Sequence, residues 1–224
     1  SPASVFFAVP MTESLFLLLT VRCVLTLERE QWWRCALLGV LAGLCRAPGG
    51  LLLGLTGLYL FMRWRRGTRP TIPSLLAMLS PAAGLGFYFL LNHLVYGRWN
   101  QYQIYQWDNW NQKLGLFTNT VRYHLDYMAQ WWDSSPKSAL ALCLAAVLCL
   151  LTILALLSAT VRRLPAHWLG FGLAYFAVTM GTTWLISAPR YAVGLFCLPV
   201  ALALLLQGRP RLTKGVLVTQ VIVS

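Results

Sequence analysis

Long apolar stretches recur along this chain, and short polar or basic segments separate them. Crossing about 30 Å of hydrocarbon takes roughly 20 helical residues, and several stretches approach that length. Hydrophobic residues make up 58% of the chain and charged residues 11%, a balance outside the usual range of soluble domains. The sequence therefore predicts an all-α fold, a polytopic transmembrane helical bundle in which residues 1–224 form a single transmembrane domain.

The apolar stretches predict seven membrane-spanning helices. They lie near residues 13–27, 33–46, 49–62, 72–96, 137–158, 166–187 and 190–207. Residues 97–136 form the one long polar segment, which is predicted to be an external loop. The chain begins at Ser1 and enters an apolar stretch at once, without the charged start of a signal peptide. We therefore expect a fragment whose earlier helices are missing.

The basic residues are concentrated between the apolar stretches. Eighteen Lys and Arg residues against six acidic residues give a formal net charge of +12, which in a soluble protein suggests a nucleic-acid partner. Here the basic residues gather in residues 63–69, 162–163 and 209–214, as in cytoplasmic loops of membrane proteins. This pattern places those three segments on the cytoplasmic side, places residues 97–136 and 187–191 outside, and argues against nucleic acid as a partner.

The segment from Trp33 to Met62 is too long for one membrane helix. As a single helix it would span roughly 45 Å at 1.5 Å per residue. The run from Arg46 to Gly50 interrupts it with Pro and Gly. Two half-helices in a hairpin would place Glu13 and Arg46 toward the external face, whereas one span would place Glu13 inside. We favour the hairpin, because interrupted helices are tolerated at membrane depth where they line a cavity.

Glu13 stands at the head of the first apolar helix, in the run from Pro10 to Ser14. A carboxylate at a bilayer boundary is a candidate for a functional group. Thr12, Glu13 and Ser14 are also ordinary helix-start residues, which satisfy free N–H groups and complement the helix dipole. Both interpretations remain open.

Two arginines are candidates for contact with an anion. Arg46 lies in an apolar context where an unpaired charge is costly, and guanidinium geometry suits phosphate. The alternative is an arginine that snorkels from a helix end. We favour the anion, because Gly49 and Gly50 let a ligand approach the backbone. For Arg190, at the external end of a later helix, a phosphate or sugar contact and an interfacial anchor both remain open.

Aromatic and amide side chains alternate in the external loop. The candidates for acceptor binding are Gln103, Gln106, Trp107, Asp108 and Trp110. Aromatic rings can stack on a sugar, while amides and a carboxylate hydrogen-bond its hydroxyl groups. The alternative is an aromatic belt at the membrane interface, which we favour for Trp131 and Trp132.

No cofactor or metal is expected from the cysteines and histidines. The six cysteines lie in or beside apolar segments without a CxxC pair, and no histidine stands at ligand spacing. The cysteines are most simply small core residues. His93, His124 and His167 are predicted to be structural.

Four segments carry a resemblance when taken together and in order. They read SPASVFFAVPMTESLFLLLT, LAGLCRAPGGLLL, YGRWNQYQIYQWDNW and SAPRYAVGLFCLPVALALL. In combination they resemble the GPI mannosyltransferase 2 (PIG-V type) family of the GT-C membrane glycosyltransferases. The resemblance covers most of the chain, although none of the four motifs is specific alone.

The resemblance implies a GT-C-like fold and transfer of mannose from a dolichyl- or other polyprenyl-phosphate donor to a lipid-linked acceptor such as a GPI precursor. The site would face the outside or the lumen, across the endoplasmic reticulum membrane of a eukaryote or the plasma membrane of a prokaryote. Such enzymes generally use an Asp in the first lumenal loop, which would lie before Ser1. Where the family more often has Arg-Ser-Asn-Gly, this chain has Arg46-Ala47-Pro48-Gly49, so contacts of the two replaced side chains do not carry over.

The sequence thus leads to the hypothesis of an inverting glycosyltransferase or its C-terminal part. Arg46 and Arg190 would lie near the donor phosphate, Glu13 at the reaction cleft as the candidate catalytic residue, and the Gln103 to Trp110 segment over the acceptor. A transporter or flippase for a polyprenyl lipid would also need broken helices and a buried arginine. A catalytically inactive assembly subunit is a third possibility.

Overall fold

The computed structural model describes residues 12–115, 117–183, 185 and 188–222, and this part of the chain is all-helical. Pro10 and Met11 of the predicted helix head, and Ser187 of the predicted outer turn, lie outside the described residues. Within these ranges the extended structure is limited to one isolated antiparallel bridge between Leu114 and Thr182. The predicted all-α class is confirmed.

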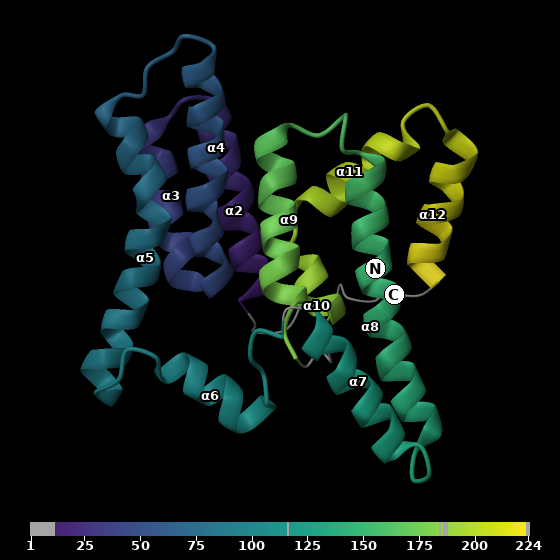
Figure 1. The fold of residues 1–224 in the computed structure, drawn as a ribbon. Helices are drawn as coiled ribbons and strands as arrows, with labels where there is room; N and C mark the ends of the chain where they lie inside the picture. Colours follow the sequence, from purple (N-terminus) through teal and green to yellow (C-terminus); the bar gives the residue numbers. More distant parts are fainter. Residues whose placement is uncertain (1–11, 116, 184, 186–187, 223–224) are drawn as a thin grey trace.

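Eleven α-helices and one short 3₁₀ helix make up the described structure (Figure 1). They are α2 (Glu13–Glu28), α3 (Trp32–Cys45), η1 (Ala47–Leu51), α4 (Leu52–Arg65), α5 (Ile72–Tyr96), α6 (Gln101–Trp110), α7 (Thr118–Trp131), α8 (Pro136–Ala159), α9 (Ala166–Met180), α10 (Ala188–Val193), α11 (Cys197–Leu206) and α12 (Pro210–Ile222).

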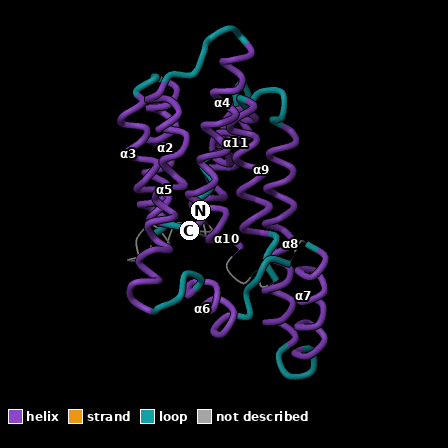
Figure 2. Tube along the Cα trace, turned by 60° about the vertical axis from the view of Figure 1, so that its left-hand side comes forward, coloured by secondary structure: helices purple, strands orange, loops and turns teal. Residues whose placement is uncertain are grey.

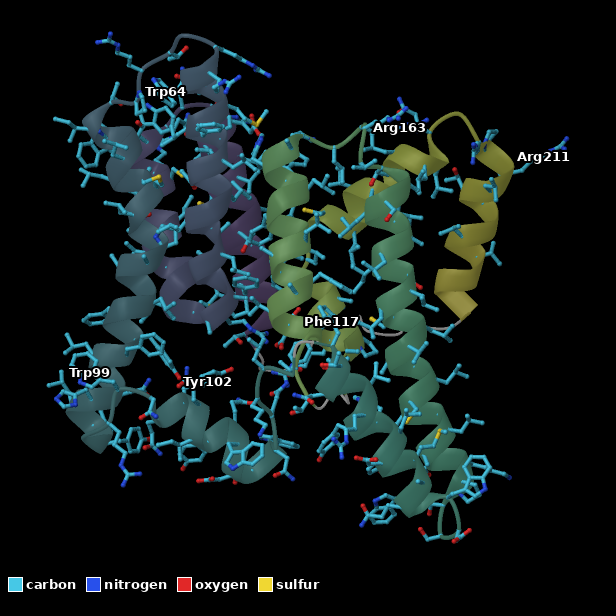
Figure 3. The ribbon with its side chains drawn as sticks, in the orientation of Figure 1. Trp64, Trp99, Tyr102, Phe117, Arg163 and Arg211 are labelled. Carbon is cyan, nitrogen blue, oxygen red and sulfur yellow. The ribbon has the colours of Figure 1, made fainter. Side chains whose placement is uncertain are left out.

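The longer helices run up and down, so that many of the connections lie at two ends of the molecule (Figures 1 and 2). Figure 3 labels Trp64, Arg163 and Arg211 at the upper end, while Trp99 and Tyr102 lie at the lower end with α6. The three basic segments therefore share one end, as their pattern predicts. We call this the basic end, and the end that carries α6 the α6 end.

Four of the predicted spans agree with observed helices to within one residue at each boundary. They correspond to α2, α3, α5 and α8. The predicted 49–62 span is shifted, because residues 47–51 form the tighter turn η1 before α4 begins at Leu52. The hairpin is confirmed: Arg46 adopts an extended conformation (φ −153°, ψ 145°), and α3 and α4 run in opposite directions on either side of η1 (Figure 1).

The predicted span at 166–187 is wrong at its end, since α9 stops at Met180. Residues 181–183 leave the helix and pair with the linker that follows α6. The Gly115 N–H donates to the Gly181 carbonyl at 2.6 Å, and the Thr183 N–H donates to the Lys113 carbonyl at 2.8 Å. These long-range bonds replace helical ones, which hydropathy alone does not reveal.

The predicted span at 190–207 is also wrong, because it consists of two helices, α10 and α11. Gly194 lies between them, and a Cβ at this position would stand 2.6 Å from the Tyr175 hydroxyl oxygen. That hydroxyl donates to the Tyr191 carbonyl at 3.0 Å. At the break the Tyr191 carbonyl thus accepts two hydrogen bonds, one from the Gly194 N–H at 3.2 Å and one from the buried tyrosine.

Residues 97–136, predicted to be a long loop, contain the helices α6 and α7. A further helix, α12, follows the last predicted span and carries Arg211 and Lys214. In both views α6 lies beyond the lower end of α5, and α7 pairs with α8 (Figures 1 and 2). Residues 97–136 thus include two helices that lie at one end of the bundle.

The prediction for the cysteines is confirmed for three of the six. Cys23, Cys35 and Cys197 are buried in the hydrophobic core, and the remaining three are half-buried. All six are free thiols.

Small residues bring α3 and α5 into close contact. A Cβ on Gly43 would lie 2.2 Å from the Pro81 carbonyl oxygen, and one on Gly84 would lie 2.1 Å from that of Val40. Gly39 and Gly43 form a Gly-x-x-x-Gly pattern, which membrane helices use to pack backbone against backbone. The glycines thus allow the backbones of α3 and α5 to approach each other closely.

Two of the described helices, α5 and α8, are long and apolar enough to cross a membrane. Much of their apolar surface is exposed. On α8 the exposed side chains include Leu140, Leu144, Val147, Leu148, Leu151 and Leu154. The shorter apolar helices are α3 and α11. Length and composition therefore support membrane association for two of the seven predicted spans.

The α3/α5 packing predicts opposite effects for two glycines of α5. Gly84→Ala should lower the free energy of unfolding by about 1–3 kcal/mol, because the methyl group meets the Val40 carbonyl. Gly86→Ala should be neutral or stabilising by about 0.5–1 kcal/mol, since nothing lies within 4 Å of its Cβ position. Unfolding of both variants in detergent, followed by circular dichroism, measures the difference. Equal effects would contradict the packing.

Candidate functional site

A cavity of about 770 Å³ lies at the α6 end of the bundle. Its wall is assembled from segments far apart in the sequence: the end of α3 with η1, the middle of α5, α6, residues 112–114, the end of α9, and α10. Arg46, Arg190, Gln103, Gln106, Trp107 and Trp110 all line it. The structure thus brings six of the eight predicted site residues to one cavity, although it does not test their roles.

Glu13 lies behind the wall of this cavity and is the point at which three helices meet. Its carboxylate Oε1 accepts a hydrogen bond from Arg46 Nη1 at 2.5 Å and another from Arg190 Nε. The Glu13 side chain is completely buried, whereas those of Arg46 and Arg190 are 15% and 31% exposed. One carboxylate therefore serves two guanidinium groups, each of which also reaches the cavity.

The position of Glu13 bears on both of its predicted roles. Helix α2 begins at Glu13 as predicted, but the Thr12 side chain makes no capping hydrogen bond. Glu13 itself is held in ion pairs and is not part of the cavity wall. The geometry therefore favours a counter-ion, since a carboxylate sealed from the cavity is poorly placed to take a proton from a substrate.

Arg46 also contacts an aromatic ring. Its guanidinium carbon stands 6.0 Å from the centroid of the Phe16 ring, and Phe16 in turn stacks on Tyr175 with ring centroids 6.3 Å apart. A cation over an aromatic ring and a buried ion pair both restrict the side chain. Arg46 is therefore a positioned group rather than a side chain that snorkels into solvent.

The charges around the cavity do not cancel. Arg46, Arg190 and Lys113 line the wall, and Glu13 supplies one negative charge behind it. Lys113 Nζ lies 4.4 Å from the centroid of the Trp107 ring. Among the lining residues that the structure describes there is no carboxylate. The cavity therefore has a positive balance and suits an anionic group such as a phosphate.

Helix α6 presents one face to the cavity. The lining residues Tyr102, Gln103, Gln106, Trp107 and Trp110 follow helical spacing. Partial burial raises the pKa of Tyr102, so its phenol keeps the proton that it can donate at neutral pH. This face therefore combines rings that can stack with amide and hydroxyl groups that can hydrogen-bond.

Asp108, predicted to bind the acceptor, is not part of that face and does not line the cavity. It is exposed, and it stands about 200° around the helix from Gln106, at about 100° per residue. A prediction that treats residues 97–136 as a loop has no periodicity with which to separate Asp108 from its neighbours, whereas helix α6 does.

The linker after α6 is fastened to the residues that precede α10. Thr120 Oγ1 donates to the Thr182 carbonyl at 2.6 Å, and Thr183 Oγ1 donates to the Asn111 carbonyl at 2.7 Å. Gln112 Nε2 donates to the Tyr191 hydroxyl at 3.1 Å. Since Tyr191 adjoins Arg190, these bonds hold α6 and the guanidinium group in a fixed relation.

Sequence reasoning missed several lining residues, among them Tyr88, Lys113 and Thr182. Lys113 had a signal, because no other basic residue occurs between Arg98 and Arg122 in a segment rich in aromatic residues. Tyr88 and Thr182 had none, since each lies within or beside an apolar stretch.

The three histidines make contacts of a structural kind. His93 stacks on Trp99 with ring centroids 4.6 Å apart, His124 hydrogen-bonds the Thr120 carbonyl, and His167 hydrogen-bonds Glu28. None of them lines the cavity at the α6 end. Among the residues described, no group of three or more His, Cys, Asp or Glu residues could hold a metal ion.

No protein-family model, curated protein or solved structure matches this chain. The resemblance to the GPI mannosyltransferase 2 family therefore stays a prediction from the motifs quoted above.

Because Glu13 pairs with two arginines, we expect its substitution to destabilise the fold strongly. Glu13→Gln should lower the free energy of unfolding by about 3–5 kcal/mol, because two poorly exposed guanidinium groups then lack a counter-charge. The matched control is Glu30→Gln, which removes a half-exposed carboxylate paired with Arg63 and should cost at most about 1 kcal/mol. Denaturant unfolding of both variants in detergent measures the difference, and a larger effect at Glu30 would contradict the arrangement.

Proposed function

We propose that this chain is a polytopic membrane glycosyltransferase of GT-C type, or a part of one. It would transfer mannose from a dolichyl- or other polyprenyl-phosphate donor to a lipid-linked acceptor such as a GPI precursor. The observation that carries this proposal is the cavity in which two guanidinium groups, each placed by a broken helix, face the aromatic and amide side chains of α6.

The guanidinium groups suit the donor phosphate. In an inverting transfer the bond between the mannose C1 and the phosphate oxygen breaks while a new bond to the acceptor oxygen forms. The departing polyprenyl phosphate gains negative charge, and preorganised donors that stabilise such charge lower the barrier. Arg46 and Arg190 reach the cavity, and Glu13 fixes both of them without cancelling their combined charge.

The α6 face suits a sugar acceptor. Trp107 and Trp110 offer rings for stacking, and Gln103 and Gln106 offer amides for hydroxyl groups. Lys113, held over the Trp107 ring, adds a cation at the same side of the cavity. A glycolipid headgroup that carries phosphate therefore matches this side of the wall.

The proposed transfer also needs a base that takes the proton of the acceptor hydroxyl. No carboxylate lines the cavity among the described residues, and Glu13 is engaged as a counter-ion. In the proposal this base is the Asp that the resemblance expects before Ser1, and Glu13 has a positioning role.

The exposed apolar surfaces of α5 and α8 support insertion in a bilayer. In the proposal the shorter helices α2, α3, α4, α9 and α11 complete the bundle as further spans. The basic end then lies on the cytoplasmic side by the positive-inside rule, which leaves the cavity on the external or lumenal side. That membrane would be the endoplasmic reticulum in a eukaryote and the plasma membrane in a prokaryote.

A transporter or flippase for a polyprenyl lipid is the second candidate. The helix breaks at η1 and at Gly194, one beside each guanidinium group, favour it, because transporters bind substrates at interrupted helices. The two candidates differ in product. A transporter moves an unchanged lipid phosphate between the leaflets of a vesicle, whereas the proposed enzyme forms a new glycosidic bond.

Radiolabelled mannose transfer from a polyprenyl-phosphate donor tests the proposal in full-length protein. Arg46→Ala should lower kcat by roughly 10²–10³-fold, since it removes one donor to the leaving phosphate. Glu13 keeps Arg190 as a partner in this variant, so folding should be retained.

The matched control is Arg34→Ala, which removes an exposed arginine from the basic end whose side chain bonds Gln31. This control should keep full activity. Undiminished turnover in the Arg46→Ala variant would remove the contact with phosphate from the proposal.

A further inference from the structure

A second cavity, of about 490 Å³, lies at the basic end of the bundle. Its wall comes from the end of α2, the last turn of α4, the turn that follows α4, and the start of α9. The residues with polar groups that line it are Glu28, Glu30, Tyr59, Arg63, Arg66, Thr68 and His167. None of these residues lines the cavity at the α6 end.

Both carboxylates of this second cavity have partners within the chain. Glu28 Oε1 hydrogen-bonds His167 Nε2 at 2.7 Å and accepts a bond from Trp168 Nε1 at 3.2 Å. Glu30 forms an ion pair with Arg63, whose guanidinium carbon stands 5.9 Å from the centroid of the Trp32 ring. Each carboxylate therefore already has a hydrogen-bonding or ion-pair partner within the chain.

Two side chains in the wall have polar groups that could bind a ligand. Arg66 forms no ion pair among the residues that the structure describes, and it lines the cavity together with Thr68. The side chain of His167 is 7% exposed, and its Nδ1 is buried without a hydrogen-bond partner. With Nε2–H donated to the Glu28 carboxylate, Nδ1 is left as an acceptor. The cavity thus offers a cation for an anion and an acceptor for a hydroxyl group.

The surroundings of this cavity indicate a lipid as the source of the anion. Trp33, Trp64 and Ile72 are more than half exposed in the neighbouring helices and turn, and Trp64 lies at the basic end in Figure 3. Exposed tryptophans are enriched at the level of lipid headgroups, and basic residues near the surface attract acidic lipids.

We propose that the cavity at the basic end binds the headgroup of an acidic phospholipid that carries hydroxyl groups, such as phosphatidylglycerol or phosphatidylinositol. Arg66 and Thr68 contact the phosphodiester, and a headgroup hydroxyl donates to His167 Nδ1. This inference rests on the membrane insertion within the proposed function but is independent of sugar transfer.

Native mass spectrometry of the purified chain, with phosphatidylglycerol and phosphatidylcholine in competition, tests this proposal. The wild type should retain phosphatidylglycerol in preference to phosphatidylcholine. Arg66→Gln should lower that preference roughly tenfold, because it removes a charge-assisted contact. Arg211→Gln, an exposed arginine at the same end outside the cavity wall, is the matched control and should keep the preference.

The outcomes separate this inference from the proposed function. An equal affinity of the wild type for the two lipids would overturn it without the use of any variant. An equal loss in Arg66→Gln and Arg211→Gln would show attraction to the surface as a whole, and full displacement of the lipid by inorganic phosphate would show a site for the free ion. Mannose transfer should be unchanged in Arg66→Gln. If the protein shows no mannose transfer at all, the proposed function is contradicted but the lipid site is not.

Discussion

The structure depends on one buried carboxylate, Glu13, that is shared by two arginines from distant parts of the chain. A lone carboxylate would be costly at this depth, and so would two guanidinium groups without a counter-charge. Together they join the head of α2, the break after α3 and helix α10 at one point. Because Arg46 and Arg190 are held from behind by Glu13, their remaining donors are presented to the cavity in a fixed arrangement. The same interaction thus closes the bundle and prepares a site for an anion.

The sequence predicted the individual helices and candidate residues better than the contacts between them. Apolar length located α2, α3, α5 and α8 to within a residue, and the Pro and Gly residues after Arg46 located the hairpin. The ends of α9 and α10 were missed, because bonds from residues 113–115 and from Tyr175 determine them. Glu13, Arg46 and Arg190 were each identified as candidates, but nothing local to any one of them indicates that they share a hydrogen-bonding oxygen. If residues 101–110 had been predicted as a helix, helical periodicity would have separated Asp108 from the face of α6 that lines the cavity.

The two ends of the bundle differ in their charged and aromatic side chains. At the basic end the two acids are paired, and the surplus arginines face outward beside exposed tryptophans. At the α6 end Arg46, Arg190 and Lys113 line one cavity together with aromatic and amide side chains of α6. In our proposals this difference gives one end an acidic lipid headgroup and the other a phosphate-bearing substrate.

The most direct test of this account is a solid-state NMR measurement of ³¹P–¹⁵N dipolar coupling, with a polyprenyl phosphate bound to the guanidinium-labelled chain in a bilayer. The account predicts coupling between the lipid phosphate and the guanidinium nitrogens of Arg46 and Arg190. Coupling found solely with arginines of the basic end, or with none, would contradict the claim that these two guanidinium groups hold a lipid-borne phosphate.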